Sequence, residues 1–128
     1  MAKILLAEDE AVIRMLLVEM LVDDGHQVIE AADGAQALAL LEADVAVLIS
    51  DVMMPRLTGD EWVTAARGRP GMDMVPVVFM SALPLPPAAK ALATAVLQKP
   101  FRPTVLVKLV QEILTGDTQT PHAGSALP

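Results

Sequence analysis

Cysteine is absent from the 128-residue chain, and aromatic residues make up only 2% of it. Without cysteine the protein can form no disulfide, no thiolate nucleophile and no cysteine-ligated metal site. The lack of cysteine fits a reducing compartment, and we expect a cytoplasmic protein.

Basic residues are also scarce, since 9 lysines and arginines face 16 acidic residues, for a net charge of −7. That sign of charge argues against binding to nucleic acid or to an anionic membrane. Long apolar runs are missing as well. We find no segment long enough to span a membrane, and the stretch from Met1 to Ala7 lacks the apolar core of a signal peptide.

Hydrophobic residues form 54% of the sequence, enough for one domain with a buried core. Short apolar runs alternate with segments whose apolar residues recur at helical spacing. This alternation predicts an α/β fold, with a doubly wound parallel sheet and helices on both of its faces. The predicted strands cover residues 3–7, 27–32, 45–50, 75–80 and 95–98. The predicted helices begin near residues 10, 35, 59, 88 and 103. The first is expected to be capped by Asp9 or Glu10, and the second to span residues 35–42. The apolar residues that recur at helical spacing in the first helix are Val12, Ile13, Leu16, Leu17, Met20 and Leu21.

The sequence also predicts where His26 and Trp62 lie in the fold. His26 follows a turn at Gly25, and we expect it at the surface with no catalytic role. Trp62, the single tryptophan, falls on the apolar face of its predicted helix. We therefore expect it in the core.

Four of the apolar runs end in a polar group. Glu8 and Asp9 follow the first run, and Asp51, Ser81 and Lys99 follow the third, fourth and fifth. In open α/β sheets the carboxyl ends of the strands are the edge where ligands bind. Each group alone has a simpler explanation, because an isolated Asp is commonly a turn residue or a helix cap, and a strand-terminal Ser or Lys is commonly a surface residue.

Together, these groups suit phosphoryl chemistry. Glu8, Asp9 and Asp51 would gather three carboxylates, which repel one another unless a cation or a proton compensates. Oxygen ligands without histidine or cysteine favour Mg²⁺ or a similar ion. The Asp51 carboxylate can attack phosphorus, Lys99 can neutralise phosphoryl oxygens, and Ser81 offers a hydroxyl donor.

These residues stand in motifs that resemble those of response-regulator receiver domains. The resemblance extends over about residues 3–115 and implies a flavodoxin-like sheet of strand order 2-1-3-4-5. It is carried by Leu5-Leu6-Ala7-Glu8-Asp9-Glu10, by Asp51-Val52-Met53-Met54-Pro55 with Gly59, by Ser81-Ala82, and by Lys99-Pro100-Phe101.

The resemblance implies a role for each site residue. Asp51 would be the phosphoacceptor, receiving a phosphoryl group from a phosphohistidine on a sensor histidine kinase or a histidine phosphotransfer protein. Asp9 would hold Mg²⁺ directly, Glu8 would hold it through water, and Met53 would offer its backbone carbonyl. Ser81 would be the switch hydroxyl and Lys99 the partner of the phosphoryl group. The Lys99–Pro100 peptide is expected to be cis.

Other positions depart from the family pattern. Val96 stands where many receivers carry the aromatic residue of a rotamer switch, and the interval from Ser81 to Lys99 is short. Pro84, Pro86 and Pro87 occupy the usual start of the fourth helix. Because prolines disfavour the helix interior, we predict a short or irregular fourth helix and signal output through an unusual face.

Met53 and Leu83 lie two positions beyond Asp51 and Ser81, where side chains can flank the path of an attacking water. Both are apolar and cannot orient that water, which predicts slow loss of the phosphoryl group. The alternative is that both side chains only fill a loop.

The sequence is therefore expected to comprise a receiver domain at 1–115 and a flexible tail at 116–128 that leaves no room for a DNA-binding domain. We expect a stand-alone signalling protein, a monomer or weak homodimer, that is not an enzyme and acts on a further protein partner. Two alternatives stay open. One is a receiver-like adaptor that is never phosphorylated, and the other is an Mg²⁺-dependent aspartyl phosphohydrolase, although Met53 stands where such enzymes usually carry a second Asp.

Overall fold

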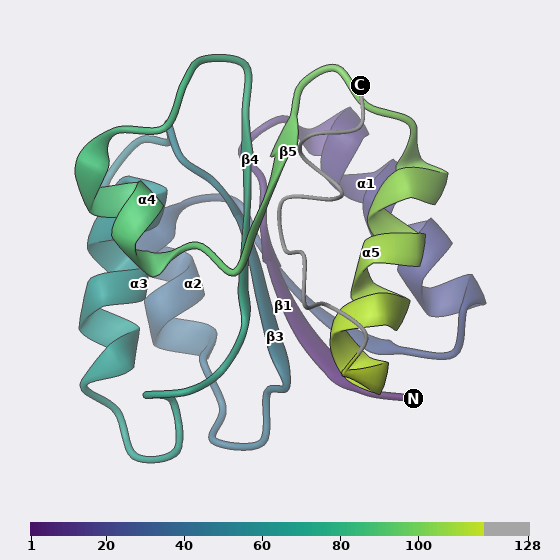
Figure 1. Ribbon diagram of the computed structural model, residues 1–128, viewed down its shortest axis with the longest axis horizontal. Coiled ribbons are helices and arrows are strands. Elements are labelled where there is room, and N and C mark those ends of the chain that lie inside the picture. The colour runs from purple at the N-terminus through teal and green to yellow at the C-terminus, as the bar shows by residue number, and fades with distance from the viewer. Residues whose placement is uncertain (117–128) are drawn as a thin grey trace.

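A computed structural model describes residues 1–116, and the predicted tail lies outside this range except for Gly116 (Figure 1). Five strands and five helices alternate along the chain. The strands are β1 (Lys3–Ala7), β2 (Gln27–Ala31), β3 (Val47–Asp51), β4 (Val77–Ser81) and β5 (Ala95–Gln98). The helices are α1 (Ala11–Asp23), α2 (Gly34–Leu40), α3 (Gly59–Arg67), α4 (Pro87–Leu92) and α5 (Pro103–Thr115). None of these helices is long and apolar enough to cross a membrane.

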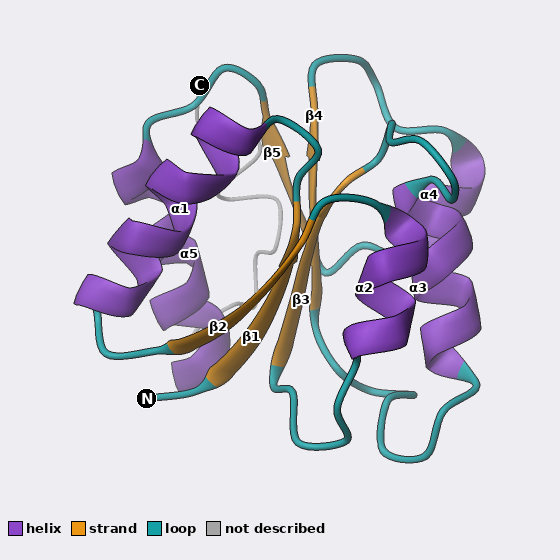
Figure 2. Ribbon diagram, turned by 180° about the vertical axis from the view of Figure 1, so that it is seen from behind, coloured by secondary structure: helices purple, strands orange, loops and turns teal. Residues whose placement is uncertain are grey.

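The strands form one parallel sheet in the order β2-β1-β3-β4-β5, which confirms the predicted fold class and topology. Helices α1 and α5 cover one face of the sheet, and α2, α3 and α4 cover the other (Figures 1 and 2). Each face has its own apolar core, because neighbouring side chains of a strand point to opposite faces. In β3, for example, Leu48 packs on the side of α2 and α3, while Val47 and Ile49 pack on the side of α1 and α5.

The central strands end one residue later than predicted. Asp51 and Ser81 are the last residues of β3 and β4, so each lies within the sheet rather than beyond it. The direction in which each side chain leaves the sheet is therefore set by the strand backbone. At the other end β4 starts at Val77, after Pro76, which has no N–H for a ladder bond and whose carbonyl accepts from Leu48 N–H over 3.0 Å.

The fourth helix begins where the prolines predict. α4 starts at Pro87, spans 6 residues and buries only Ala89 fully. Pro86 has an extended backbone, and Pro87 occupies the first turn, where a missing N–H costs nothing. The prediction of a short fourth helix is confirmed.

The predicted inner face of α1 is partly wrong. Only Leu17 and Leu21 are buried, whereas Val12 and Leu16 are 74% and 45% exposed. The helix rests on the sheet through a narrow row of residues four apart, with Ile13 continuing it. Predicted capping by the side chain of Asp9 or Glu10 is also wrong, because Glu10 occupies the N-cap and its side chain makes no capping hydrogen bond within the described residues.

The helix α2 ends at Leu40, two residues short of the predicted 35–42. Arg69 Nη2 donates to the Leu38 carbonyl over 3.3 Å, and Leu41 takes an extended backbone. The side chain of Leu41 still packs on the core of that face.

His26 is buried, contrary to the surface position predicted for it. Its side chain is 4% exposed, Nδ1 accepts from Ala2 N–H over 3.1 Å, and Nε2 lies 3.3 Å from Asp24 Oδ2. The histidine fastens the start of β1 to the turn after α1. Trp62, predicted to lie in the core, is fully buried, and that prediction is confirmed.

Candidate functional site

The carboxyl ends of β1, β3, β4 and β5 bring the predicted site residues to one edge of the sheet. Glu8, Asp51 and Ser81 are buried, and Asp9 is exposed at the rim. Oxygens of Glu8, Asp9 and Asp51 all lie within 4.8 Å of one another. The three predicted carboxylates therefore form one cluster.

Lys99 joins this cluster from the end of β5. Its Nζ lies 2.7 Å from Asp51 Oδ1 and 3.0 Å from Glu8 Oε1. The adjoining Lys99–Pro100 peptide is cis, as expected. The lysine thus compensates part of the negative charge that β1 and β3 bring together.

Glu8 is held by bonds that the sequence did not predict. Its Oε2 accepts from Glu10 N–H over 3.0 Å, and its carbonyl accepts from Arg14 Nη1 over 2.8 Å. Arg14 also pairs with Glu30 at 3.3 Å. An arginine one helical turn into α1 gave no sequence signal for this role, because charged residues on a helix usually face solvent.

The pKa values of the two buried carboxyls are shifted in opposite directions. Burial raises the pKa of Asp51 to about 8; the adjacent Glu8 carboxylate adds to the rise, and the Lys99 ammonium opposes it. Burial also works to raise the pKa of Glu8, but the Asp51 carboxyl, the Glu10 N–H and Lys99 together lower it below its ordinary value. Asp51 is therefore the carboxyl that keeps a proton near neutrality.

The cluster has the donor set of a site for a hard cation. Asp51 Oδ2 is buried and accepts no hydrogen bond from the described residues, so it is free to accept another ligand. All the side-chain donors are oxygens, which suits Mg²⁺. Asp9 and Asp51 line a hollow of about 380 Å³, together with Met53, Ser81 and Leu83.

Ser81 faces this hollow but is bonded away from the carboxylates. Its hydroxyl donates to the Leu83 carbonyl over 2.6 Å and accepts from Leu83 N–H over 3.1 Å. Its own carbonyl accepts from Lys99 N–H over 2.8 Å. Ser81 thus connects the site to the proline-rich segment that leads to α4.

The loop after Asp51 is fastened to α2, a feature that the sequence did not predict. Arg56 has a positive φ of 66°, and its Nη1 donates to Asp33 Oδ2 over 2.8 Å. Asp33 also caps α2 by accepting from Gln36 N–H over 2.7 Å. A Cβ on Gly34 would lie 2.3 Å from the Leu57 carbonyl oxygen, so only glycine permits this close approach.

An apolar groove adjoins the site on the side of α1 and the segment after β5. It has a volume of about 400 Å³ and shares Glu10, Ala82 and Lys99 with the hollow over Asp51. Its apolar walls come from Ile13, Leu16, Leu17, Pro100, Phe101 and Pro103.

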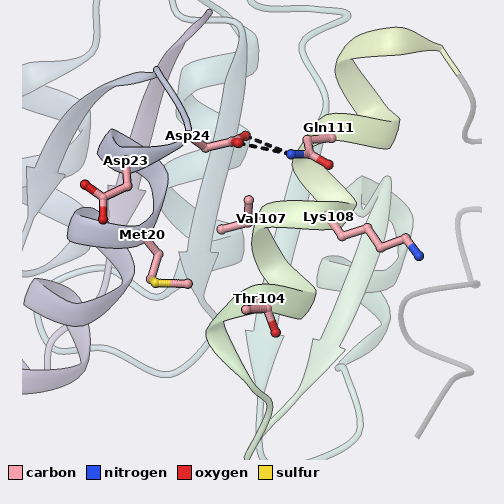
Figure 3. A pocket seen from close by; sticks show the side chains of 7 residues that line it. All are labelled: Met20, Asp23, Asp24, Thr104, Val107, Lys108 and Gln111. Carbon is pink, nitrogen blue, oxygen red and sulfur yellow. Dashed lines mark hydrogen bonds between the residues drawn. The ribbon is translucent and has the colours of Figure 1, made fainter.

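Another hollow, of about 430 Å³, lies between α1 and α5 and contains none of the predicted site residues (Figure 3). Gln111 Nε2 donates to both carboxylate oxygens of Asp24 over 3.1 Å, which bridges the two helices. The polar groups there stabilise the contact of α1 with α5.

Comparison with known proteins identifies the family. The model of the response regulator receiver domain matches residues 4–111. The transcriptional regulatory protein CpxR of Klebsiella pneumoniae is 36% identical over 134 residues, covering 98% of this chain and 56% of CpxR. PdtaR of Mycobacterium tuberculosis is 36% identical over 115 residues, covering 85% of this chain and 55% of PdtaR. The chain thus spans about half the length of these curated relatives.

Solved structures give the same result. The chemotaxis response regulator CheY4 of Vibrio cholerae superposes with a TM-score of 0.81 at 39% identity, covering 88% of this chain and 98% of CheY4. The receiver domain of the Pseudomonas aeruginosa sensor histidine kinase PA1611, solved with a magnesium ion in its active site cleft, has a TM-score of 0.78 at 26% identity. The superposition covers 87% of this chain and 95% of the PA1611 domain. With its strand order and the acidic cluster at the sheet edge, the chain belongs to the response regulator receiver domain family of two-component signalling proteins.

Proposed function

We propose that this receiver accepts a phosphoryl group on Asp51 in an Mg²⁺-dependent reaction and signals by binding another protein. The observation that carries the proposal is the buried Asp51 Oδ2, which accepts no hydrogen bond from the described residues and sits beside Lys99 and two further carboxylates. A carboxylate in this setting is a nucleophile with a counter-charge at hand.

Asp9 and Asp51 would hold Mg²⁺, with Glu8 acting through water and Met53 through its backbone carbonyl. When bound, Mg²⁺ supplies positive charge to the phosphoryl oxygens. The PA1611 receiver holds a magnesium ion in its active site cleft, which supports the same metal here.

The proposed reaction forms an acyl phosphate. The proton of Asp51 would go to solvent, because bound Mg²⁺ favours the ionised form of this carboxyl. An oxygen of the Asp51 carboxylate then attacks phosphorus, and an O–P bond forms as the N–P bond to the donor imidazole breaks. The electron pair of the broken bond stays on the imidazole nitrogen. Lys99, already 2.7 Å from Asp51, would compensate the charge of the incoming phosphoryl oxygens, and Ser81 would turn its hydroxyl towards them.

We propose a sensor histidine kinase or a histidine phosphotransfer protein as the phosphodonor. The apolar groove beside Lys99 supports a protein donor, because its walls give a helix-borne phosphohistidine apolar surface to pack against. The same groove includes Leu16, which is 45% exposed.

We propose that the segment at Pro84 and Pro86 changes its conformation on phosphorylation. This segment is exposed, and the hydrogen bond between Ser81 and Leu83 connects it to the site.

Incubation with acetyl phosphate and Mg²⁺ tests the proposal. We expect a stable adduct of one phosphoryl group by intact-mass spectrometry, absent in Asp51→Asn and absent when EDTA removes the metal. Sustained phosphate release without an adduct would instead identify a phosphohydrolase. No reaction at all would identify an adaptor that is not phosphorylated.

A further inference from the structure

The backbone of Asp51 is joined to α3 by a buried chain of hydrogen bonds. Trp62 Nε1–H donates to Ser50 Oγ over 2.9 Å, and the Ser50 hydroxyl donates to the Asp51 carbonyl oxygen over 2.7 Å. Trp62 and Ser50 are fully buried, and Asp51 is 3% exposed. We call this chain of three residues the indole relay. Because water cannot replace either donor, each group in the relay depends on the next.

The relay acts on the opposite side of β3 from the chemistry. Ser50 and Asp51 are consecutive strand residues, so their side chains point in opposite directions. Ser50 meets Trp62 in the layer of α3, and the Asp51 carboxylate meets Lys99 at the sheet edge. The hydroxyl that bonds the Asp51 carbonyl and the Asp51 carboxylate therefore lie on opposite faces of the same strand end.

The first residue of α3 leaves no room for a side chain beside the same carbonyl. A Cβ on Gly59 would lie 2.2 Å from the Asp51 carbonyl oxygen and 3.1 Å from the Phe79 ring. Gly59 N–H donates to the Val52 carbonyl over 2.7 Å. Helix α3 thus holds the end of β3 at two points, one at Gly59 and one turn later at Trp62.

We propose that Ser50 and Trp62 are positioning residues for phosphorylation of Asp51. The inference rests on the function proposed above and adds two residues that touch neither the phosphoryl group nor the metal. Loss of the Ser50 hydroxyl leaves the buried Asp51 carbonyl without its donor, and loss of the Trp62 N–H leaves the Ser50 hydroxyl without the bond that orients it. In either case the 51–52 peptide is held less firmly, and the Asp51 carboxylate departs from the alignment that attack requires.

Phosphorylation kinetics of Ser50→Ala and Trp62→Phe test the inference, with acetyl phosphate as the probe and saturating Mg²⁺. Ser50→Ala removes the hydroxyl that donates to Asp51 and accepts from Trp62, and Trp62→Phe removes the indole N–H but keeps a smaller aromatic ring. We expect the maximal rate constant to fall roughly tenfold in each, as for other losses of alignment, while the half-saturating acetyl phosphate concentration changes less than twofold. The double variant is expected to fall no further than the slower single variant, because the relay acts as one unit.

Two controls separate positioning from general weakening of the structure. Ser50→Thr keeps the hydroxyl on a β-branched residue suited to a strand, and its rate should return to within twofold of wild type. Thr64→Ala removes a hydroxyl bond to the Asp60 carbonyl on the same helix, and its rate should not change. All rates are compared at a temperature where circular dichroism shows every variant folded. If Ser50→Ala does not fold, Trp62→Phe with its retained ring carries the comparison.

Wild-type rates in both relay variants would overturn the inference, and so would a loss confined to the half-saturating concentration or a failure of Ser50→Thr to restore the rate. These outcomes leave the proposed function intact, since wild type and variants would still carry the phosphoryl group. A wild-type chain that takes up no phosphoryl group would overturn the proposed function and the inference together.

Discussion

At the scale of single residues, the site separates two carboxyls that are chemically alike. Glu8 gains bonds from Glu10 N–H and Lys99, which favour its charged form. Asp51 is buried beside that charge, and its pKa rises to about 8. Ionisation of Asp51, the proposed nucleophile, is therefore unfavourable in the free protein, and a bound cation would favour it.

This arrangement predicts a pH dependence of stability. The unfolded chain releases the Asp51 proton near pH 3.9, whereas the folded chain keeps it to about pH 8. The contribution of this group is fully present below about pH 4 and is lost as the pH rises towards 8. Without divalent cations, Asp51→Asn should exceed wild type in unfolding free energy at pH 8 by at least about 1.4 kcal/mol, the worth of one pKa unit.

Urea denaturation at pH 5 and pH 8 measures this difference. The gain of Asp51→Asn over wild type should be larger at pH 8 than at pH 5. Asp73→Asn, at an exposed position outside the cluster, serves as the control and should show no such trend. A gain independent of pH would contradict the assigned titration.

Met53 and Leu83 determine a second prediction. Both side chains are 68% exposed and line the hollow over Asp51, which agrees with the positions expected from the sequence. Because neither can orient a water, the double variant Met53→Asn, Leu83→Gln should lose the phosphoryl group roughly tenfold faster than wild type, the scale of a weakly positioned acid–base group. Decay is followed by intact-mass spectrometry after removal of acetyl phosphate.

Met74→Gln is the control, because Met74 is 85% exposed and lies outside that hollow. This variant should lose its phosphoryl group at the wild-type rate. Equal decay in the double variant would mean that both side chains only fill the loop.

At the scale of helices and strands, simple physical signals predicted much of the fold. The prolines before Pro87 fixed the start of α4, and continuous apolar runs located β1, β3 and β4. Periodicity predicted α1 but not which of its apolar residues face the sheet, because nearly every position is apolar. Contacts between distant segments, such as Trp62 with Ser50, follow from strand order and helix packing and leave no local signal beyond the need of a buried indole for an acceptor.

At the scale of helices and strands, we predict that a substitution at the junction of β3 with α3 destabilises the fold. Gly59→Ala places a Cβ against the Asp51 carbonyl oxygen, so α3 or the end of β3 has to shift. We expect a loss of about 1–3 kcal/mol of unfolding free energy, as for overpacked sites, together with slower phosphorylation. Gly68→Ala is the matched control, because the nearest atom to its Cβ would be at an ordinary 3.5 Å and its φ is −80°. Equal stability of the two variants in urea would show that α3 moves aside without cost.

At the scale of the whole molecule, the site exists only when the sheet is assembled. Glu8 and Asp9 follow β1, Asp51 ends β3 and Lys99 follows β5, so no single segment contains the cluster. The residue types could be predicted from the sequence because each closes an apolar run. Their distances could not be predicted, since they depend on the order β2-β1-β3-β4-β5.

Binding of Mg²⁺ should therefore stabilise the entire fold. A cation that binds only the folded chain adds about 1.4 kcal/mol at a free concentration ten times its dissociation constant. Thermal unfolding followed by circular dichroism should show a rise in Tm with Mg²⁺, reversed by EDTA. Asp9→Asn should abolish the rise and Asp73→Asn should retain it. An equal rise in both would place Mg²⁺ at unspecific surface acids.

The indole relay also makes the chain its own optical probe. Trp62 is the only tryptophan among the 128 residues, and its ring nitrogen is two hydrogen bonds from the Asp51 carbonyl. Every photon of tryptophan emission therefore originates beside the residue on which signalling is proposed to depend. Its intensity and wavelength can follow the arrival of a metal or a phosphoryl group in real time, with no label and no engineered fluorophore.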